Sequence, residues 1–307
     1  MESRRMIAST RFYRRACGSA LALLMASATV VVADGGVGAS AHPAASKGPV
    51  DVIAAGSLET ILAKLAPSFA KETGYSLVPT TNGAFADASE IKGETVKEDV
   101  FISAGPAPVQ DLEGAKNGDW ASWYAQIGTT PLLVGYNPRS KFAHDLRTMP
   151  WYKVVVMKGF LLGRTDPATD PKGVLAVAAL DDAAAKYHEP ALKTLGTESS
   201  NVYTEDSLVG RLQAGQLDAG FFYGVEATAA TPPLKTITLA PLKLSATYDL
   251  VILNRAPHEA GAVAFTSWLL GPKAKAILTA EGFTLDKPAK LTGNKSAVPR
   301  ALHSVIS

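Results

Sequence analysis

Val50-Asp-Val-Ile-Ala-Ala-Gly-Ser-Leu58 is the stretch from which the fold of this chain can be worked out. Its first half is apolar and rich in β-branched residues, which predicts a buried strand, and the run ends at Gly56-Ser57. Apolar residues then recur at helical spacing, at Leu58, Ile61, Leu62, Leu65 and Phe69. The stretch therefore predicts a strand that turns directly into a helix, with Ser57 at the N-cap.

The turn at Gly56-Ser57 has the features of an anion site. A strand that leads straight into a helix presents backbone N–H groups and a hydroxyl at the positive end of the helix dipole. The same turn can also do no more than cap the helix. This turn alone does not decide between the two interpretations.

Residues 1–41 have the pattern of a secretory signal peptide. Five arginines precede an apolar run from Ala16 to Ala33, and Ala39-Ser40-Ala41 matches the small-residue pattern before a cleavage site. The apolar run is short for a membrane span and contains Ser, Gly and Thr. We therefore expect export to the periplasm with a cleaved signal peptide.

Charge and cysteine content exclude several classes of function. Without residues 1–41 the chain carries 25 basic and 26 acidic residues, a net charge of −1, so binding to nucleic acid or to an anionic membrane is not expected. The single cysteine, Cys17, lies in the signal segment, which excludes disulfides and thiolate chemistry from the remainder. The remaining length allows one large domain or two lobes with separate cores.

Strands and helices alternate along the rest of the chain, which predicts an α/β fold with parallel strands. In such sheets ligands bind beyond the carboxyl ends of the strands. The polar tail after Phe283 is expected to wrap the surface. After residues 50–69, we expect extended segments at 75–78, 99–103, 130–136, 154–163, 218–223 and 248–253, and helices at 84–91, 174–186, from 204 to 215, 258–270 and 272–280.

The sequence offers little support for catalysis. Its five histidines are not spaced with other ligand residues as in a metal motif, and neither a G-x-S-x-G elbow nor a phosphate-binding P-loop is present. A secreted hydrolase that uses Ser57 is an alternative, but it needs a base, and no histidine lies in a recognisable partner motif. We therefore expect a protein that is not an enzyme and has no cofactor.

Four segments resemble the periplasmic molybdate- and tungstate-binding proteins of ABC importers. The third of them is most similar to the tungstate-binding branch. The run from Ala262 to Phe283 also resembles the C-terminal helices of the family. The four segments are Ala54-Ala-Gly-Ser-Leu58, Glu98-Asp-Val-Phe-Ile-Ser-Ala104, Gly163-Arg-Thr-Asp-Pro167 with Asp170-Pro-Lys-Gly173, and Glu205-Asp-Ser-Leu208 leading to Gln213–Tyr223.

The resemblance implies a two-lobed α/β solute-binding protein of the class II type, in which each lobe is a mixed sheet flanked by helices. Lobe one would comprise residues 50–129 plus 246–307, and lobe two residues 130–245. The lobes would close by a hinge motion on a ligand, molybdate or tungstate, in the cleft. The protein would act as a monomer and deliver this oxyanion to an inner-membrane ABC permease with its cytoplasmic ATPase.

The resemblance also implies ligand-binding residues. Ser57 and Tyr223 would donate hydroxyl groups to the oxyanion from the two lobes. Asp166 and Glu205 match positions at which carboxylates approach the Mo or W atom itself. Carboxylates repel a simple tetrahedral dianion but ligate a hard metal centre, so their presence argues against sulfate.

One loop departs from the family pattern. The family's second loop supplies a serine hydroxyl, whereas this chain has Asn82-Gly83-Ala84. The Asn82 side chain, or the amides of Gly83 and Ala84, would replace it. Selectivity is expected from cavity size and fixed donors, without a cationic residue. A two-lobed receptor for another small anion or for a metal ion is the alternative.

Overall fold

Nine strands pair into one mixed sheet within residues 46–307, the part of the chain that the computed structural model describes. The predicted signal peptide, residues 1–41, and Cys17 lie outside the described residues. Pairing follows the order β2-β1-β3-β8-β4-β6-β5, and β7 and β9 also pair with β4. The strands are β1 (Gly48–Ala55), β2 (Tyr75–Asn82), β3 (Val100–Ser103), β4 (Trp123–Tyr136), β5 (Leu162–Gly163), β6 (Ala219–Tyr223), β7 (Lys235–Thr238), β8 (Ser245–Ile252) and β9 (Thr284–Gly293).

The predicted strand-to-helix junction is confirmed at β1. This strand pairs in parallel with β2 and β3, and the chain passes through a short 3₁₀ turn, η1 (Gly56–Leu58), into α1 (Glu59–Thr73). Gly74 ends α1 in the left-handed conformation, at φ 80°. The predicted N-cap role of Ser57 is wrong, because Ser57 lies within η1 and Leu58 is the residue that precedes α1.

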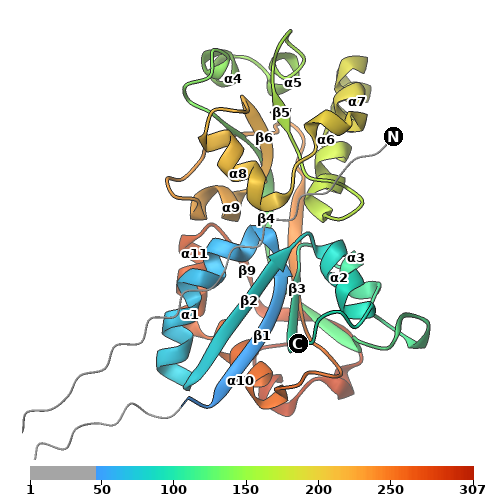
Figure 1. The fold of residues 1–307 in the computed structure, drawn as a ribbon, viewed down its shortest axis with the longest axis vertical. Coiled ribbons are helices and arrows are strands. Elements are labelled where there is room, and N and C mark those ends of the chain that lie inside the picture. Colours follow the sequence, from blue (N-terminus) through green and yellow to red (C-terminus); the bar gives the residue numbers. More distant parts are fainter. Residues whose placement is uncertain (1–45) are drawn as a thin grey trace, which may run out of the picture. The chain divides into compact units, whose positions relative to one another are not determined.

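The long strand β4 links two groups of strands (Figure 1). Its first half pairs with β8 and β9, and its second half pairs with β6 and β7. The strand predicted at 130–136 is thus the second half of a longer element. The predicted lobe boundaries fall inside β4 and at the start of β8, and as boundaries between moving bodies they stay a prediction.

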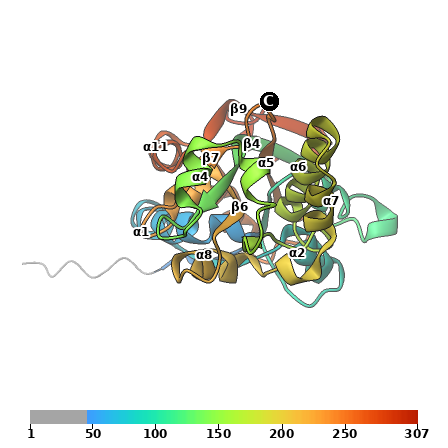
Figure 2. The ribbon, with the colours of Figure 1, turned by 90° about the horizontal axis from the view of Figure 1, so that it is seen from above.

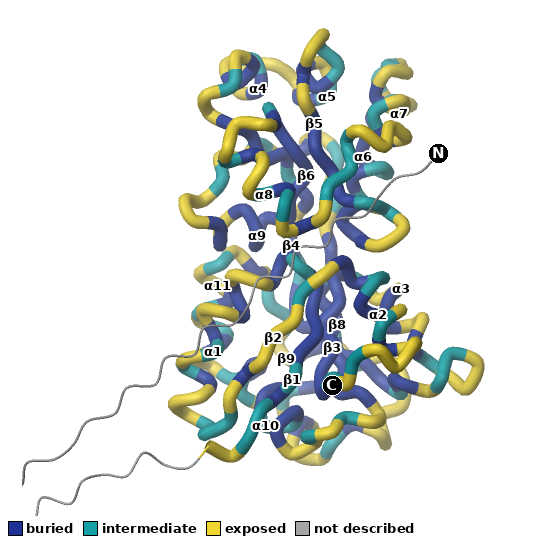
Figure 3. The backbone as a smooth tube through the Cα atoms, viewed as in Figure 1, coloured by how far each residue is buried: buried dark blue, intermediate teal, exposed yellow. Residues whose placement is uncertain are grey.

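Helices flank both groups of strands. Figures 1 and 3 show α1, α2 and α10 around β1 to β3, and α6, α8 and α9 around β6. Of these strands β1, β3 and β6 are mostly buried, whereas β2 is largely exposed. Figure 2 shows α6 and α7 side by side, where they pack together. The remaining helices are α2 (Ala84–Lys92), α3 (Ala107–Gln110), α4 (Ala143–Thr148), α5 (Trp151–Val154), α6 (Pro171–Tyr187), α7 (Pro190–Thr197), α8 (Glu205–Gln213), α9 (Gly224–Ala229), α10 (Glu259–Leu269) and α11 (Pro272–Ala280).

Two sequence-based predictions of local structure are wrong. The tail after Phe283 does not only wrap the surface, because Thr284–Gly293 forms β9 and pairs antiparallel with β4. Most of the stretch predicted as extended at 154–163 is not extended, because Trp151–Val154 is a helical turn with buried Trp151 and Val154 and a turn follows it. Only Leu162–Gly163, at its end, forms a strand, β5. No helix within residues 46–307 is both long and apolar enough to cross a membrane.

Candidate functional site

A cavity of about 150 Å³ lies between the start of α1 and the helices α8 and α9. Gly56 and Ser57 line it from the turn after β1, and Glu205 and Glu226 line it from α8 and α9. Because a water molecule in the liquid takes about 30 Å³, this volume corresponds to about five waters. The cavity can therefore hold a small ion.

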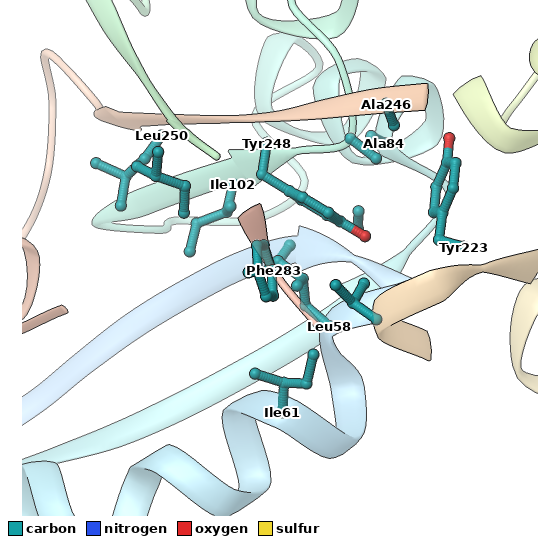
Figure 4. Close-up of a cluster of buried hydrophobic side chains, with 14 of the residues drawn as sticks. Leu58, Ile61, Ala84, Ile102, Tyr223, Ala246, Tyr248, Leu250 and Phe283 are labelled. Atoms are coloured by element: carbon teal, nitrogen blue, oxygen red, sulfur yellow. The ribbon is translucent and has the colours of Figure 1, made fainter. Parts of the chain in front are cut away.

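Ser57 is buried at the inner end of this cavity and bonds to another hydroxyl group. Its Oγ lies 2.8 Å from the phenol oxygen of Tyr248, and either atom can be the donor. The Tyr248 ring packs edge-on against Tyr223, with ring centroids 6.2 Å apart. Figure 4 shows the Tyr248 hydroxyl directed toward the side on which Tyr223 lies. Two predicted ligand donors, Ser57 and Tyr223, thus contact one buried ring.

Three buried oxygen atoms near Tyr248 lack a hydrogen-bond partner among residues 46–307. They are Oδ2 of Asp170, Oε2 of Glu205 and the phenol oxygen of Tyr223. Buried polar atoms in folded proteins are nearly always hydrogen-bonded, so three such atoms close together beside a cavity are what a site would show whose ligand supplies the partners. Asp170 precedes α6, and its other oxygen accepts a 2.8 Å hydrogen bond from the amide of Lys172. This helix cap fixes the Asp170 carboxylate at the site.

A lysine that the sequence reasoning missed lies between the two glutamates. Lys172 is completely buried, and its ammonium donates to Glu205 Oε1 at 2.8 Å and to both oxygens of Glu226 at 2.9 and 2.8 Å. The same ammonium lies 5.7 Å and 5.8 Å from the ring centres of Phe222 and Tyr223. The structure thus places an ammonium group beside the predicted ligand residue Glu205, while the expected source of selectivity, cavity size and fixed donors, stays a prediction.

Burial and the close charges shift the pKa values of Lys172, Glu205 and Tyr223. Burial raises the pKa of Glu205 well above its ordinary value, and the negative charge of Asp170 adds to this effect. Burial lowers the pKa of Lys172, but the charges of Glu205 and Glu226 outweigh it and raise that pKa above its ordinary value. Burial, followed by the charge of Asp170, also raises the pKa of the Tyr223 phenol, which therefore keeps its proton and remains a hydrogen-bond donor.

The second loop, residues 82–84, faces the loop before α6. The exposed Asn82 accepts a hydrogen bond from the amide of Gly83 through its own side chain, and Ala84 is buried at the start of α2. The amides of Phe85 and Ala86 donate to the carbonyl oxygen of Thr169, at 3.0 and 3.2 Å. The start of α2 thus binds the Thr169 carbonyl in this form of the protein.

Asp166 contributes none of the three buried oxygens. It is partly exposed, and its carboxylate accepts a 2.9 Å hydrogen bond from the amide of Ala168 in its own loop. Of the two Asp-Pro pairs in this loop, the second places its aspartate in the cluster, because Asp170 caps α6 and is buried. The repeated Asp-Pro pattern was a visible signal, but the sequence did not say which aspartate turns inward.

A second group of ionisable residues lies toward the amino ends of β1 and β3, whereas the Gly56 turn follows the carboxyl end of β1. His258 Nδ1 is 3.1 Å from Asp99 Oδ2 and 3.4 Å from Asp51 Oδ2, and the His258 amide donates to Asp99 Oδ1 at 2.6 Å. Their ligand atoms lie within 4.8 Å of one another, a spacing that could hold a metal ion. The Asp99 carboxylate also accepts the amide of Asp51, so the group already ties α10 to the sheet.

Comparison with known proteins identifies the family. The model of the family described as bacterial extracellular solute-binding protein matches residues 50–284, which include most of β1, all of β2 to β8, and Asp170, Lys172, Glu205, Tyr223 and Glu226. The chain belongs to this family. Its members are binding proteins, which agrees with the cavity between α1, α8 and α9.

Named relatives of this solute-binding protein include molybdate-binding proteins. The molybdate/tungstate-binding protein WtpA of Pyrococcus abyssi is 23% identical over 281 residues, which cover 73% of this chain and 80% of the relative. A putative ABC transporter molybdenum-binding protein of Haloferax volcanii is 30% identical over 175 residues, 57% of this chain and 54% of the relative.

The fold is shared with a solved binding protein. The periplasmic molybdate-binding protein of Azotobacter vinelandii matches with a TM-score of 0.60 at 20% identity, covering 78% of this chain and all of that protein. At this identity the match establishes the fold alone. The prediction of a two-lobed α/β binding protein, with mixed sheets flanked by helices, is confirmed.

Proposed function

We propose that this solute-binding protein captures molybdate or tungstate for an ABC importer. The observation that carries the proposal is the set of three buried oxygens without a partner within residues 46–307, on Asp170, Glu205 and Tyr223, beside the hydroxyl of Ser57. Two hydroxyl groups can donate to the oxygens of such an anion, and two carboxylates can ligate its metal centre. The names of the relatives support the same cargo.

The proposed ligand residues are those predicted from the sequence, with one exchange. Ser57, Glu205 and Tyr223 keep their predicted roles. Asp170 takes the role predicted for Asp166, because only Asp170 is buried beside the other three. The side chain of Asn82 and the amides of Gly83 and Ala84 would contact the ligand only if the Thr169 carbonyl moved away from the start of α2.

Transport requires release as well as capture. We propose that the protein acts as a periplasmic monomer with two lobes, residues 50–129 plus 246–307 and residues 130–245. The lobes would close on the anion, and the closed protein would then dock to an inner-membrane permease with its cytoplasmic ATPase. Support comes from β4 and β8, through which the chain passes between the two groups of strands. Motion about these two strands would be a hinge closure.

Calorimetry of the purified protein against molybdate, tungstate, sulfate and phosphate tests the cargo. Binding of molybdate or tungstate that is much tighter than binding of sulfate or phosphate is the expected result. A bound ligand should also raise the melting temperature, because at a hundredfold excess over Kd it adds about 2.7 kcal/mol of stability. If neither metal oxyanion binds or shifts melting at millimolar concentration, the proposed cargo is wrong.

A metal cation is the second candidate, because the cavity is rich in carboxylates. Glu59, Glu205, Asp206 and Glu226 all line it. Carboxylates are the usual ligands of hard cations. The same calorimetry with ferric citrate, calcium and manganese distinguishes the candidates, since a cation receptor would bind one of these and neither molybdate nor tungstate.

A further inference from the structure

Lys172 has an unusual position for a lysine. Its side chain has no exposed surface, it leaves the first turn of α6, and its three hydrogen bonds all go to Glu205 and Glu226. A cation in the first turn of a helix is disfavoured by the helix dipole. Burial of an ammonium adds a further desolvation cost, which a buried ion pair often fails to repay relative to an apolar residue. Compared with an all-apolar cluster, stability thus gives no reason for this group of buried charges, although a cation is stabilising once Glu205 and Glu226 are buried here.

The contacts of Lys172 determine how Glu205 faces the cavity. The ammonium binds Oε1 of Glu205, and Oε2 is left without a partner among the residues that the structure describes. Oε2 lies against Gly56, where a Cβ atom would be only 2.7 Å away. Glu226 holds the ammonium from the other side and also accepts the amide of Tyr223 at 3.3 Å. The Glu205 carboxylate is thus fixed with one oxygen toward the turn that carries Ser57.

Lys172 also changes the charge that an incoming anion meets. Asp170, Glu205 and Glu226 place three carboxyl groups around the site, and burial raises their mutual repulsion because the local dielectric is low. A single ammonium 2.8 Å from two of them offsets part of this negative charge. Without it, every charged side chain among Asp170, Glu205 and Glu226 that an oxyanion approaches would be negative.

We propose that Lys172 is the residue that determines specificity at the oxyanion site, by positioning Glu205 through Oε1 so that Oε2 is presented to the metal atom of the bound anion. This inference rests on the proposed function. Lys172 acts through Glu205 and does not itself touch the ligand. Molybdate and tungstate can accept a carboxylate oxygen at the metal, whereas the sulfur of sulfate cannot, so the orientation of Glu205 separates the two classes of anion.

The test compares the unmodified protein with Lys172→Met by calorimetry against tungstate and sulfate. Substitution of a residue that orients a metal ligand typically lowers affinity by about 10- to 100-fold. We expect Lys172→Met to lower the affinity for tungstate by that factor and the affinity for sulfate by less. The preference for tungstate over sulfate should fall accordingly. An unchanged tungstate affinity and an unchanged preference in a folded Lys172→Met protein would overturn the inference.

Two further variants separate orientation from charge and guard against misfolding. The double variant Lys172→Met with Glu226→Gln removes one charge of each sign. If it recovers full tungstate binding, Lys172 acts through its charge alone, and the positioning role is overturned.

Lys172→Arg keeps the charge but changes the donor geometry. We expect it to fold and to lose part of the tungstate preference, and an unaltered preference would contradict us. If the unmodified protein binds neither molybdate nor tungstate, the proposed function fails first and this inference with it.

Discussion

Ser57 and Tyr248, 191 positions apart in the chain, share a 2.8 Å hydrogen bond that ties the turn after β1 to β8. Tyr248 has no exposed surface and packs against Tyr223 on one side and Phe283 on the other. When the phenol donates to Ser57, the proton of the serine is free to bind an anion. Tyr248 therefore orients one proposed ligand donor and contacts a second.

Tyr248→Phe should weaken oxyanion binding because it removes the partner that orients Ser57. The loss should be about 1 kcal/mol, the usual net contribution of a neutral hydrogen bond, or about fivefold in Kd by calorimetry. Ser57→Ala should cost more, about 1.5–3 kcal/mol, because it removes a hydrogen bond to a charged group. If both folded variants bind the oxyanion with the affinity of the unmodified protein, the pair of Ser57 and Tyr248 takes no part in binding.

Removal of the Asp170 or Glu205 carboxylate should change tungstate affinity in opposite directions under the two accounts of binding. If Asp170 and Glu205 ligate the metal of the anion, Asp170→Asn and Glu205→Gln should each weaken tungstate binding by at least about tenfold, although each removes a negative charge from an anion site. An asparagine also keeps the cap of α6. If the anion is held by hydrogen bonds alone, both changes should leave binding unchanged or improve it.

Asp166→Asn is the matched control for these variants. Asp166 lies four residues from Asp170 in the same loop, but it is partly exposed and bonds to its own loop. Calorimetry should find the tungstate affinity of Asp166→Asn within about twofold of the unmodified protein, since surface substitutions change stability and binding little. A large loss in this variant, with none in Asp170→Asn, would restore the role first predicted for Asp166.

Elements with a strong local pattern could be predicted from the sequence. The strand and helix around Gly56, and the helices α10 and α11, lie within a few residues of their predicted bounds, because apolar spacing and helix-end residues specify them locally. The strand β9 could not be predicted, because its side chains are mostly polar and exposed and its position depends on backbone pairing with β4.

The sequence named some of the side chains that lie close together in the structure. Ser57 and Glu205 line one cavity, and Tyr223 packs against the tyrosine that bonds to Ser57, while their roles as ligand residues stay a prediction. The roles of Lys172 and Tyr248 depend on tertiary contacts. A lysine in a first helical turn is usually solvated, and a tyrosine in an apolar strand usually fills a core. Only the contacts with Glu205 and Ser57 distinguish these two residues from ordinary ones.

Gly83→Ala should hinder closure of the two proposed lobes. The backbone of Gly83, at φ −66° and ψ 129°, is one that alanine adopts freely, but a Cβ here would collide with the carbonyl oxygen of Thr169. The variant should therefore fold normally, bind tungstate more weakly, and keep a larger radius of gyration than the unmodified protein at saturating ligand. Small-angle scattering measures this difference.

Gly196→Ala serves as the control for Gly83→Ala. Gly196 lies in α7, and a Cβ there would approach no atom closer than 3.7 Å, an ordinary contact. This variant should bind and compact as the unmodified protein does, with a slight gain in stability because alanine favours helices. Identical scattering curves for all three proteins with ligand would argue against closure through the contact of Gly83 with Thr169.

The buried Asp87 predicts a dependence of stability on pH. Its two carboxylate oxygens lack a partner within residues 46–307, and burial raises its pKa to about 8, with further contributions from Glu90, Asp170 and Glu98. The ordinary value is near 3.8. The folded protein thus retains a proton that the unfolded chain releases, and stability falls as the pH rises from about 4 to about 8, by up to about 1.4 kcal/mol per pH unit.

Asp87→Asn removes this ionisation and should make the protein more stable at neutral and alkaline pH. Thermal melts of the ligand-free protein at pH 5, 7 and 9 should show a gain in Tm over the unmodified protein that grows with pH, because the asparagine stays neutral where the aspartate must ionise or hold its proton. Asp182→Asn, at an exposed position of α6, is the control and should shift the Tm by a similar small amount at all three pH values. A gain for Asp87→Asn that is the same at pH 5 and pH 9 would show that Asp87 does not hold a proton in the folded protein.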